Sequence, residues 1–328
     1  MYNNIKSNYI FKKIIKEYLS KKSYFLLVKH NKKIQNKLGL KLDDYKEYHI
    51  RIFNTTEIEL IPISELKPDI KYYFIRIKEN RGYYHIYFDD QRDEIKRSYI
   101  TNLDKVKKIN IKLDMELKSL AWLFYDCQVL KGIKFTKFNR ENFTNMNEMF
   151  YQCLYLDKLD IQKLKTSNVT SMNWMFTRCE SLKELNLLNF DTSNVKEMMC
   201  VFSGCIKLEK INFNFNTSKV NNMRNMFFEC KSLKEIDVSN FDTSNVKNFS
   251  EMFYRCISLD NLNLRNFTFK YTFKSYEYDR KYGNMFGCCN NKLKENIRNQ
   301  IVNFSEINKN FKVFDSKYWD LIFIIYLF

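Results

Sequence analysis

Hydrophobic and polar positions recur with one fixed period through the middle of this chain. From about Leu117 to Leu264, a phenylalanine that follows an apolar residue stands three positions before each of six cysteines. The cysteines are Cys127, Cys153, Cys179, Cys205, Cys230 and Cys256, with steps of 26, 26, 26, 25 and 26 residues. A constant period between roughly 20 and 50 residues is typical of proteins whose units stack on one another. We therefore expect a stacked array with one continuous core.

Each unit shows two hydrophobic periods. Val169, Met172 and Met175 follow steps of three, which predicts the buried face of a helix. The polar residues Thr166–Asn168 precede this run, as helix N-caps do. Apolar and polar residues then alternate over Leu185–Leu187, which predicts a short strand. The predicted fold is an α/β leucine-rich-repeat solenoid of about seven 26-residue helix–strand turns, with a parallel sheet on its concave side.

The N-terminal flank has different patterns. Apolar steps of three and four over residues 8–37 predict helices. Period-two alternation predicts strands over 57–61, 72–77 and 83–88, and Asn80-Arg81-Gly82 between the last two is a hairpin signal. This part is therefore expected to be a small α+β unit.

Three parts of the chain follow from these patterns. Residues 1–100 form the helical plus β unit, which acts as a cap or an adaptor, and residues 101–293 form the repeat array. Residues 294–328 form a C-terminal cap and tail, beginning with a polar closing helix over 294–304. No apolar run reaches the roughly 18 residues that a membrane helix needs, and no signal peptide is visible. We expect no membrane span and a cytoplasmic location.

Charge adds little to this picture. The formal net charge is +17, yet residues 128–267 carry 19 Lys and Arg against 15 Asp and Glu. The excess is thus spread over both flanks. Nucleic-acid binders gather their cations on one face, so we do not expect a nucleic-acid partner. A steep loss of affinity with salt would identify one.

The repeat resembles the leucine-rich repeat, and more closely its BspA-like (Treponema-type) variety. The subgroup pattern is Met-x-x-Met-Phe-x-x-Cys-x-x-Leu-x-x-Leu-x-Leu-x-x-Phe-Asp-Thr-Ser-Asn-Val, and the units ending at Cys205 and Cys230 carry it nearly whole. The match extends from about Leu117 to Leu293, with one residue fewer near Phe215. Described bacterial members are surface proteins that bind host matrix proteins. The resemblance therefore implies a surface adhesin as an alternative location and role.

The chemistry of catalysis is absent from the sequence patterns. Six of the nine cysteines occupy one repeat position beside a phenylalanine, which predicts a ladder of free thiols in the core. Such a ladder fits a reducing compartment. No Cys-x-x-Cys pair, phosphate loop, zinc motif or Ser/His/Asp arrangement occurs. We expect no enzyme, no catalytic residue, no cofactor, no metal and no small-molecule substrate.

The concave strand face is the candidate binding site, because stacked repeats usually bind partners there. Its outward polar positions between and beside the strand leucines are Lys134, Asp160, Asn186, Asn212, Asp237, Asn263, Lys158, Glu184, Lys210 and Glu235. The expected partner is a protein, whose identity the sequence does not name. These positions could equally be solvated repeat positions without a partner.

A second function stays open from the N-terminal region. Residues 8–40 resemble the two short helices of an F-box, which implies an adaptor that recruits targets to a ubiquitin ligase. A simple capping role for these helices is the alternative. The oligomeric state and the biological process are not readable from the sequence.

Overall fold

The chain divides into two compact units, Met1–Asn54 and Thr55–Phe328. The computed structural model describes residues 55–77, 83–114, 119–264, 266–267 and 284–307. The predicted helices within 8–37 and the F-box-like segment 8–40 lie outside the described residues. The boundaries predicted near residues 100 and 293 stay predictions.

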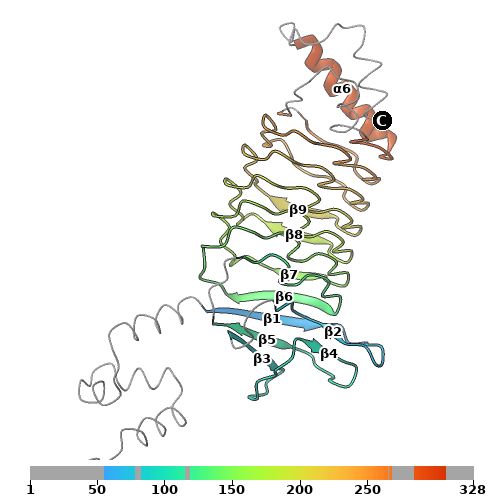
Figure 1. Ribbon diagram of the computed structural model, residues 1–328. Coiled ribbons are helices and arrows are strands. Elements are labelled where there is room, and N and C mark those ends of the chain that lie inside the picture. The colour runs from blue at the N-terminus through green and yellow to red at the C-terminus, as the bar shows by residue number, and fades with distance from the viewer. Residues whose placement is uncertain (1–54, 78–82, 115–118, 265, 268–283, 308–328) are drawn as a thin grey trace, which may run out of the picture. The chain divides into compact units, whose positions relative to one another are not determined.

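The regular elements of the described residues are mostly strands (Figure 1). They are β1 (Thr56–Pro62), β2 (Tyr72–Tyr73), β3 (Tyr84–Phe88), β4 (Tyr99–Ile100), β5 (Ile109–Leu113), β6 (Leu130–Lys137), β7 (Lys158–Asp160), β8 (Glu184–Leu187), β9 (Lys210–Phe213) and the helix α6 (Asn291–Ile307). One five-stranded sheet has the order β3-β5-β1-β6-β7, and β2-β4 and β8-β9 form two smaller sheets. The β6–β7 and β8–β9 pairs are parallel, and the other pairs of these strands are antiparallel.

The five-stranded sheet follows from alternating hydrophobicity. In β1 the side chains of Ile58 and Leu60 are buried, while Glu57 and Glu59 are half-exposed and Ile61 is exposed. The strands predicted at 57–61 and 83–88 are confirmed as β1 and β3. The predicted hairpin is wrong, because β3 pairs with β5 and β2 pairs with β4. Alternation identifies a strand but not its partner, and the five residues of β5 offer β3 a longer ladder than the two of β2.

The repeats contain no α-helix within the described residues, so the predicted leucine-rich-repeat solenoid of helix–strand turns is wrong. The described helix, α6, follows the repeats and covers the segment 294–304 that was predicted to be helical. The expected continuous parallel sheet is also not formed. The strand β7 has three residues, and the fifth and sixth repeats share an isolated bridge between Glu235 and Asn261.

The segment predicted to be helical, Val169–Cys179, is a run of tight turns. Every second N–H donates to the carbonyl three residues earlier, namely Met175 to Met172, Thr177 to Trp174 and Cys179 to Phe176, at 3.1–3.2 Å. The intervening N–H groups donate to the next repeat, namely Met172 to Glu197, Trp174 to Met199, Phe176 to Val201 and Arg178 to Ser203, at 2.8–3.0 Å. A helix would satisfy these donors internally. In this segment, half of the N–H groups find their acceptor in the next repeat, so they are satisfied only when two repeats stack.

The polar residues before each run also have a different role from the predicted N-cap. The Thr166 hydroxyl is buried and donates to the carbonyl of Asp191 in the next repeat (3.0 Å). The Asp191 carboxylate accepts the N–H of Ser193 two residues later (3.0 Å), which lowers the pKa of that carboxyl. This is a local turn of the kind that short polar side chains favour. These residues therefore fasten consecutive repeats together instead of starting a helix.

Two positions of the repeat have a left-handed backbone. They stand five and one residues before the cysteine, with φ between +53° and +71°, and comprise Trp122, Asp126, Glu148, Gln152, Trp174, Arg178, Cys200, Gly204, Asn225, Glu229, Glu251, Arg255, Asn284 and Cys288. Each is the third residue of one of the tight turns, where a positive φ is required. Among these fourteen positions only Gly204 is a glycine. The other side chains are held in this conformation at a cost of about 1–2 kcal/mol each.

Substitutions at Gln152 test this strain. We expect Gln152→Gly to raise the free energy of unfolding by about 0.5 kcal/mol, since the relieved strain outweighs the added chain entropy of glycine. Gln152→Val should lower it by about 1–2 kcal/mol because a β-branched residue fits positive φ poorly. Urea unfolding measures both. Lys207, which lacks a positive φ, is the control position. There, the same two substitutions should not combine a gain in the free energy of unfolding with Gly and a loss with Val.

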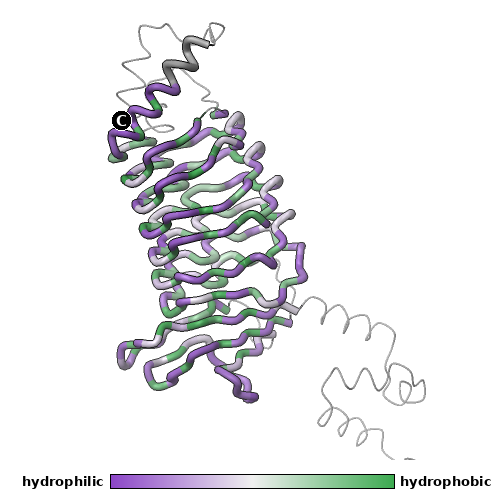
Figure 2. Tube along the Cα trace, turned by 180° about the vertical axis from the view of Figure 1, so that it is seen from behind, coloured by the Kyte–Doolittle hydropathy of each residue, from purple (hydrophilic) through white to green (hydrophobic). Residues whose placement is uncertain are grey.

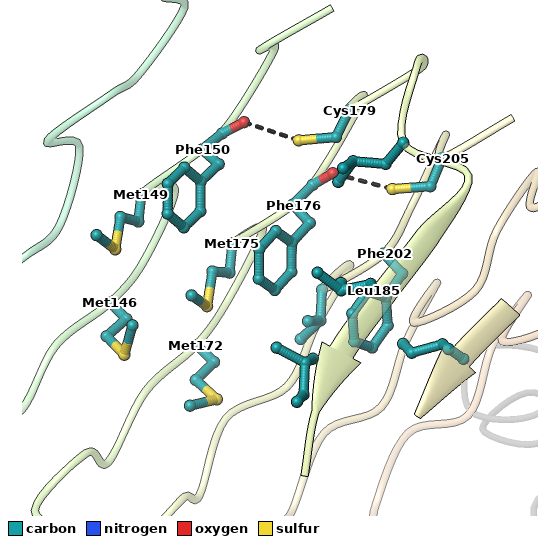
Figure 3. Close-up of a cluster of buried hydrophobic side chains, with 14 of the residues drawn as sticks. Met146, Met149, Phe150, Met172, Met175, Phe176, Cys179, Leu185, Phe202 and Cys205 are labelled. Carbon is teal, nitrogen blue, oxygen red and sulfur yellow. Dashed lines mark hydrogen bonds between the residues drawn. The ribbon is translucent and has the colours of Figure 1, made fainter. Parts of the chain in front are cut away.

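The core of the repeats is a ladder of parallel phenylalanine rings. Consecutive ring centroids lie 5.3–5.7 Å apart with interplanar angles of 3–13°, along Phe124, Phe150, Phe176, Phe202, Phe227, Phe253 and Phe286. Beside the rings, methionines repeat in the same way (Figure 3). All eight repeat methionines expected in the core are buried, namely Met146, Met149, Met172, Met175, Met198, Met223, Met226 and Met252. Figure 2 shows the complementary polar positions interleaved with apolar ones along each turn.

The cysteines form the predicted ladder of free, buried thiols, and they also donate hydrogen bonds. The Cys179 thiol donates to the Phe150 carbonyl of the preceding repeat (3.2 Å), and the Cys205 thiol donates to the Phe176 carbonyl (3.1 Å) (Figure 3). The Phe176 carbonyl also accepts the N–H of Cys179 in its own repeat (3.1 Å). Both lone pairs of this carbonyl are thereby used. Cysteine is thus a small hydrophobe that also satisfies a buried acceptor.

Thiol labelling should separate the cysteines sharply. Burial raises the pKa of Cys153 and Cys205 to about 12, so their reactive thiolate forms are scarce at neutral pH. The Cys288 thiol is exposed. We expect a maleimide at pH 7 to modify Cys288 quickly in the native protein and the ladder cysteines only after denaturation. Peptide mapping measures this, and rapid native modification of Cys179 would contradict the buried ladder.

Candidate partner-binding face of the repeat strands

The structure places the sequence-predicted site residues in two rows on the strand side of the repeats. Row A, five residues after the repeat cysteine, holds Lys158, Glu184, Lys210 and Glu235. Row B, two residues further, holds Lys134, Asp160, Asn186, Asn212, Asp237 and Asn263. All ten are exposed or half-exposed, while the intervening strand residues Leu185 and Ile211 are buried.

Strand register brings neighbouring members of each row together. In the β8–β9 pair, Glu184 lies opposite Lys210 and Asn186 lies opposite Asn212. In the β6–β7 pair, Lys134 lies opposite Asp160, and its Nζ is 3.8 Å from the Asp160 carboxylate. Both partners of that ion pair are about half exposed, so its contribution to stability is below about 1 kcal/mol.

Row B also serves the backbone. The Asp160 carboxylate accepts the N–H of Gln162 (3.3 Å), and the Asn186 amide oxygen accepts the N–H of Leu188 (3.2 Å). The Asp237 carboxylate accepts the N–H of Ser239 (2.9 Å). Hydrogen bonds from the Ser239 side chain and backbone lower the pKa of Asp237. The Asn and Asp residues that recur in this row therefore have a turn-forming role, which explains their uniformity without a partner.

A third row of charges lies beside row A, and sequence reasoning missed it. Row C, four residues after the cysteine, holds the exposed residues Lys131, Asp157, Lys183, Glu209, Lys234 and Asp260. The N–H of Asp157 donates to the carbonyl of Lys131 (3.0 Å), and the N–H of Glu209 donates to that of Lys183 (2.8 Å). These bonds show that consecutive members are neighbours. Aligning the repeats on the cysteine is the signal that could have revealed the row.

Comparison with known protein families gives a match to the repeats. The family described as Mycoplasma protein of unknown function, DUF285, matches residues 118–214 and 183–299, which together make up more than half of the chain. The chain belongs to this family. DUF285 is a BspA-like repeat-type family. No curated protein and no solved structure matches this chain.

In this DUF285 chain, rows A and C form a checkerboard of charge. Signs alternate along row C from Lys131 to Asp260 and along row A from Lys158 to Glu235. They also alternate within a repeat, as at Lys183 and Glu184. Opposite charges on neighbouring strands attract, whereas like charges would repel. The checkerboard carries no net charge, so it offers a patterned surface instead of a basic or acidic patch.

Two other features, a metal-binding cluster and a membrane-spanning helix, are not found among the described residues of this DUF285 chain. Over the described part of the chain, no cluster of three or more His, Cys, Asp or Glu residues is arranged to hold a metal ion. None of the helices in that part is both long and apolar enough to span a membrane.

Proposed function

We propose that this protein is a non-enzymatic protein-binding module that contacts its partner through rows A, B and C. The observation that supports this proposal is the checkerboard on the strand face. An array of alternating charges discriminates between partners by pattern, because a shift by one repeat sets like charges against each other. A polyanion such as nucleic acid gains little from a surface without net charge. The partner is therefore expected to be a protein surface with interspersed charges of both signs.

Inverting the checkerboard tests this function. In the inverted variant, every Lys of rows A and C becomes Glu and every Asp or Glu becomes Lys, at Lys131, Asp157, Lys158, Lys183, Glu184, Glu209, Lys210, Lys234, Glu235 and Asp260. These ten exchanges keep the net charge at +17, since the ten positions hold five cations and five anions. Opposite neighbours within the rows also remain opposite. Lys292→Glu accompanies Asp260→Lys, because the Lys292 Nζ lies 2.8 Å from the Asp260 carboxylate, and this added change brings the net charge to +15. Apart from this pair, only the pattern presented to a partner changes.

The expected result is the loss of specific partners. Native and inverted proteins are used side by side to capture proteins from the native cell lysate, with urea unfolding as the control for folding. We expect proteins captured by the native chain to be reduced at least tenfold with the inverted chain at an unchanged urea midpoint. Equal capture by both chains contradicts binding through these rows. Capture that instead depends on residues 1–54 would assign recruitment to the N-terminal unit, as in the F-box-like alternative.

The subgroup and the compartment are part of the same proposal. We place the chain in the Met-Phe-x-x-Cys, Phe-Asp-Thr-Ser-Asn-Val subgroup of BspA-like repeats, on the pattern at Cys205 and Cys230. We propose a cytoplasmic location, supported by nine unpaired cysteines, which suit a reducing compartment. The alternative is a cell-surface adhesin. Protease treatment of intact cells decides between them, since only a surface protein is degraded.

A further inference from the structure

A shallow hollow lies between the strand region of residues 72–99 and the first two repeats. Its volume is about 640 Å³, and its walls include Tyr73, Arg76, Ser98, Trp122, Tyr125 and Glu148. The hollow belongs to neither the strand face nor the core ladder. Ligand sites are typically concave, with aromatic walls and a few polar groups.

The aromatic walls are unusually accessible. The side chains of Tyr73 and Trp122 are 40% and 38% exposed, although tryptophan is among the most strongly buried residue types on average. The Tyr73 ring and the Trp122 backbone are held in place. The Tyr73 ring packs edge-to-face on Tyr99 at 5.9 Å, and Trp122 has a left-handed backbone with its N–H bonded to the carbonyl of Asn147 (3.1 Å). A fixed, exposed ring such as that of Tyr73 contributes to a preorganised binding surface.

Arg76, the cationic residue in the wall, already pairs with the Asp126 carboxylate. The Arg76 Nε donates to the Tyr125 carbonyl (2.7 Å), and its Nη2 lies 3.2 Å from the Asp126 carboxylate. Its guanidinium also lies over the Tyr73 ring, 4.9 Å from the centroid. Arg76 therefore acts as a neutralised part of the wall, and Glu148 is the other charged residue that lines the hollow.

One anionic residue that lines the hollow is uncompensated. Among the described residues, the Glu148 carboxylate has no cationic partner within ion-pair distance. Burial first, and then the charges of Tyr151, Glu148 and Asp126, raise the pKa of Tyr125, and the opposing effect of Arg76 is smaller. An uncompensated carboxylate in a chain of net charge +17 favours a cationic ligand.

We propose that this hollow binds an alkylated ammonium group, with Trp122 as the principal aromatic contact and the Glu148 carboxylate as the counter-ion. Tyr73 and Tyr125 complete the aromatic wall, although Arg76 already lies over the Tyr73 ring and Tyr151 stacks on the Tyr125 ring (5.0 Å). Aromatic faces attract such cations through their quadrupole, and the attraction strengthens when the cation leaves water. An alkylated ammonium suits this hollow better than a small hydrated cation because its methyl groups also pack against the rings. This inference is independent of the protein-binding function proposed for the strand face.

Calorimetric titration of the full chain with choline tests the proposal. The control ligand is 3,3-dimethylbutan-1-ol, which has the shape of choline without the charge. We expect choline to bind in the millimolar range and the neutral alcohol to bind about tenfold more weakly or not at all. Equal affinities would mean that the hollow is only an apolar depression. No heat at 50 mM choline would also overturn the proposal.

Matched variants locate the site. Trp122→Ala and Glu148→Gln should each weaken choline binding at least fivefold. Trp174→Ala and Glu251→Gln change the same residue types at the same repeat position outside the hollow, so they should bind choline like the native chain. Equal loss in these controls would contradict a site in the hollow.

Two further probes identify the source of the ammonium group. Sedimentation with phosphatidylcholine vesicles tests a lipid headgroup, and titration with Nε-trimethyl-lysine tests a modified protein side chain. Binding of either probe that is lost in Trp122→Ala supports the site and names its source. Binding of both probes that persists in Trp122→Ala overturns it.

Discussion

Above about pH 9, the free energy of unfolding should fall by roughly 10 kcal/mol per pH unit, and the protein should unfold near pH 10. Seven buried thiols cause this fall, namely Cys127, Cys153, Cys179, Cys205, Cys230, Cys256 and Cys289. Each contributes about 1.4 kcal/mol per pH unit. The combined effect within one pH unit is comparable with the whole stability of a typical domain, about 5–15 kcal/mol.

The sign follows from the direction of the pKa shifts. Burial raises the thiol pKa of Cys153 and Cys205 to about 12 and that of Cys289 to about 11, and raises that of Cys179 well above its usual value. In the unfolded chain a thiol has a pKa of about 8.5. Below that pH both states are neutral and the stability of the ladder is fully present. As the pH rises toward the folded-state pKa, only the unfolded chain loses protons, so the folded state is progressively destabilised.

Urea unfolding at a series of pH values measures this slope. Tyrosines and lysines also titrate in this range, so the comparison between variants isolates the thiols. Replacing Cys179 and Cys205 by serine should reduce the slope by two protons, whereas Cys288→Ser should leave it unchanged because that thiol is exposed. A slope that is the same in all three proteins would contradict the prediction.

The second large effect concerns the ring ladder. Phe202→Ala should lower the free energy of unfolding by about 3–5 kcal/mol, because it removes a fully buried ring and leaves a cavity. The lost ring stacks between Phe176 at 5.7 Å and Phe227 at 5.3 Å, so the cavity opens between two repeats. Denaturation in urea and hydrogen exchange give the global loss and its location.

Two further variants serve as comparisons for the loss of stability in Phe202→Ala. Leu188→Ala removes an apolar side chain that is 59% exposed, and its cost should stay within about 0.5 kcal/mol. Phe202→Leu keeps most of the buried volume and should cost less than Phe202→Ala. A loss below 1 kcal/mol for Phe202→Ala would show that the repeats close over the missing ring.

The core of this protein could be predicted from sequence, but its backbone could not. Buried Phe176, Met172 and Cys179 were identified because burial depends on position in the repeat. The same steps of three are produced by consecutive tight turns, so periodicity alone did not exclude a helix. The decisive difference is the left-handed residue in each turn, and residues such as Trp174 and Arg178 do not reveal it by their type. The polar residues before each run were wrongly predicted to be helix N-caps for the same reason. An aspartate such as Asp191 can accept an N–H of a turn as readily as an N–H of a helix.

The candidate sites were predictable to different extents. Rows A and B follow from the strand leucines, so their positions could be read from the repeat. Row C was missed because Lys183 precedes the strand alternation, although it occupies a fixed repeat position. No periodic pattern in the sequence could have predicted the hollow. Tyr73 and Arg76 come from outside the repeats, and only folding brings them beside Trp122.

The thiol bonds give the array a direction along which it can grow. Each thiol of the ladder binds the preceding repeat, except that of Cys127, which has no such repeat before it and lies 3.7 Å from the carbonyl of Tyr125. At the other end, the Cys289 thiol still binds backward to Phe253 (3.0 Å), and α6 follows. A duplicated unit inserted ahead of α6 would bring its own cysteine thiol as a donor. The phenylalanine carbonyl of the repeat before it would accept that hydrogen bond. Relatives with more or fewer repeats can therefore arise by gain or loss of whole units, without any change to either end.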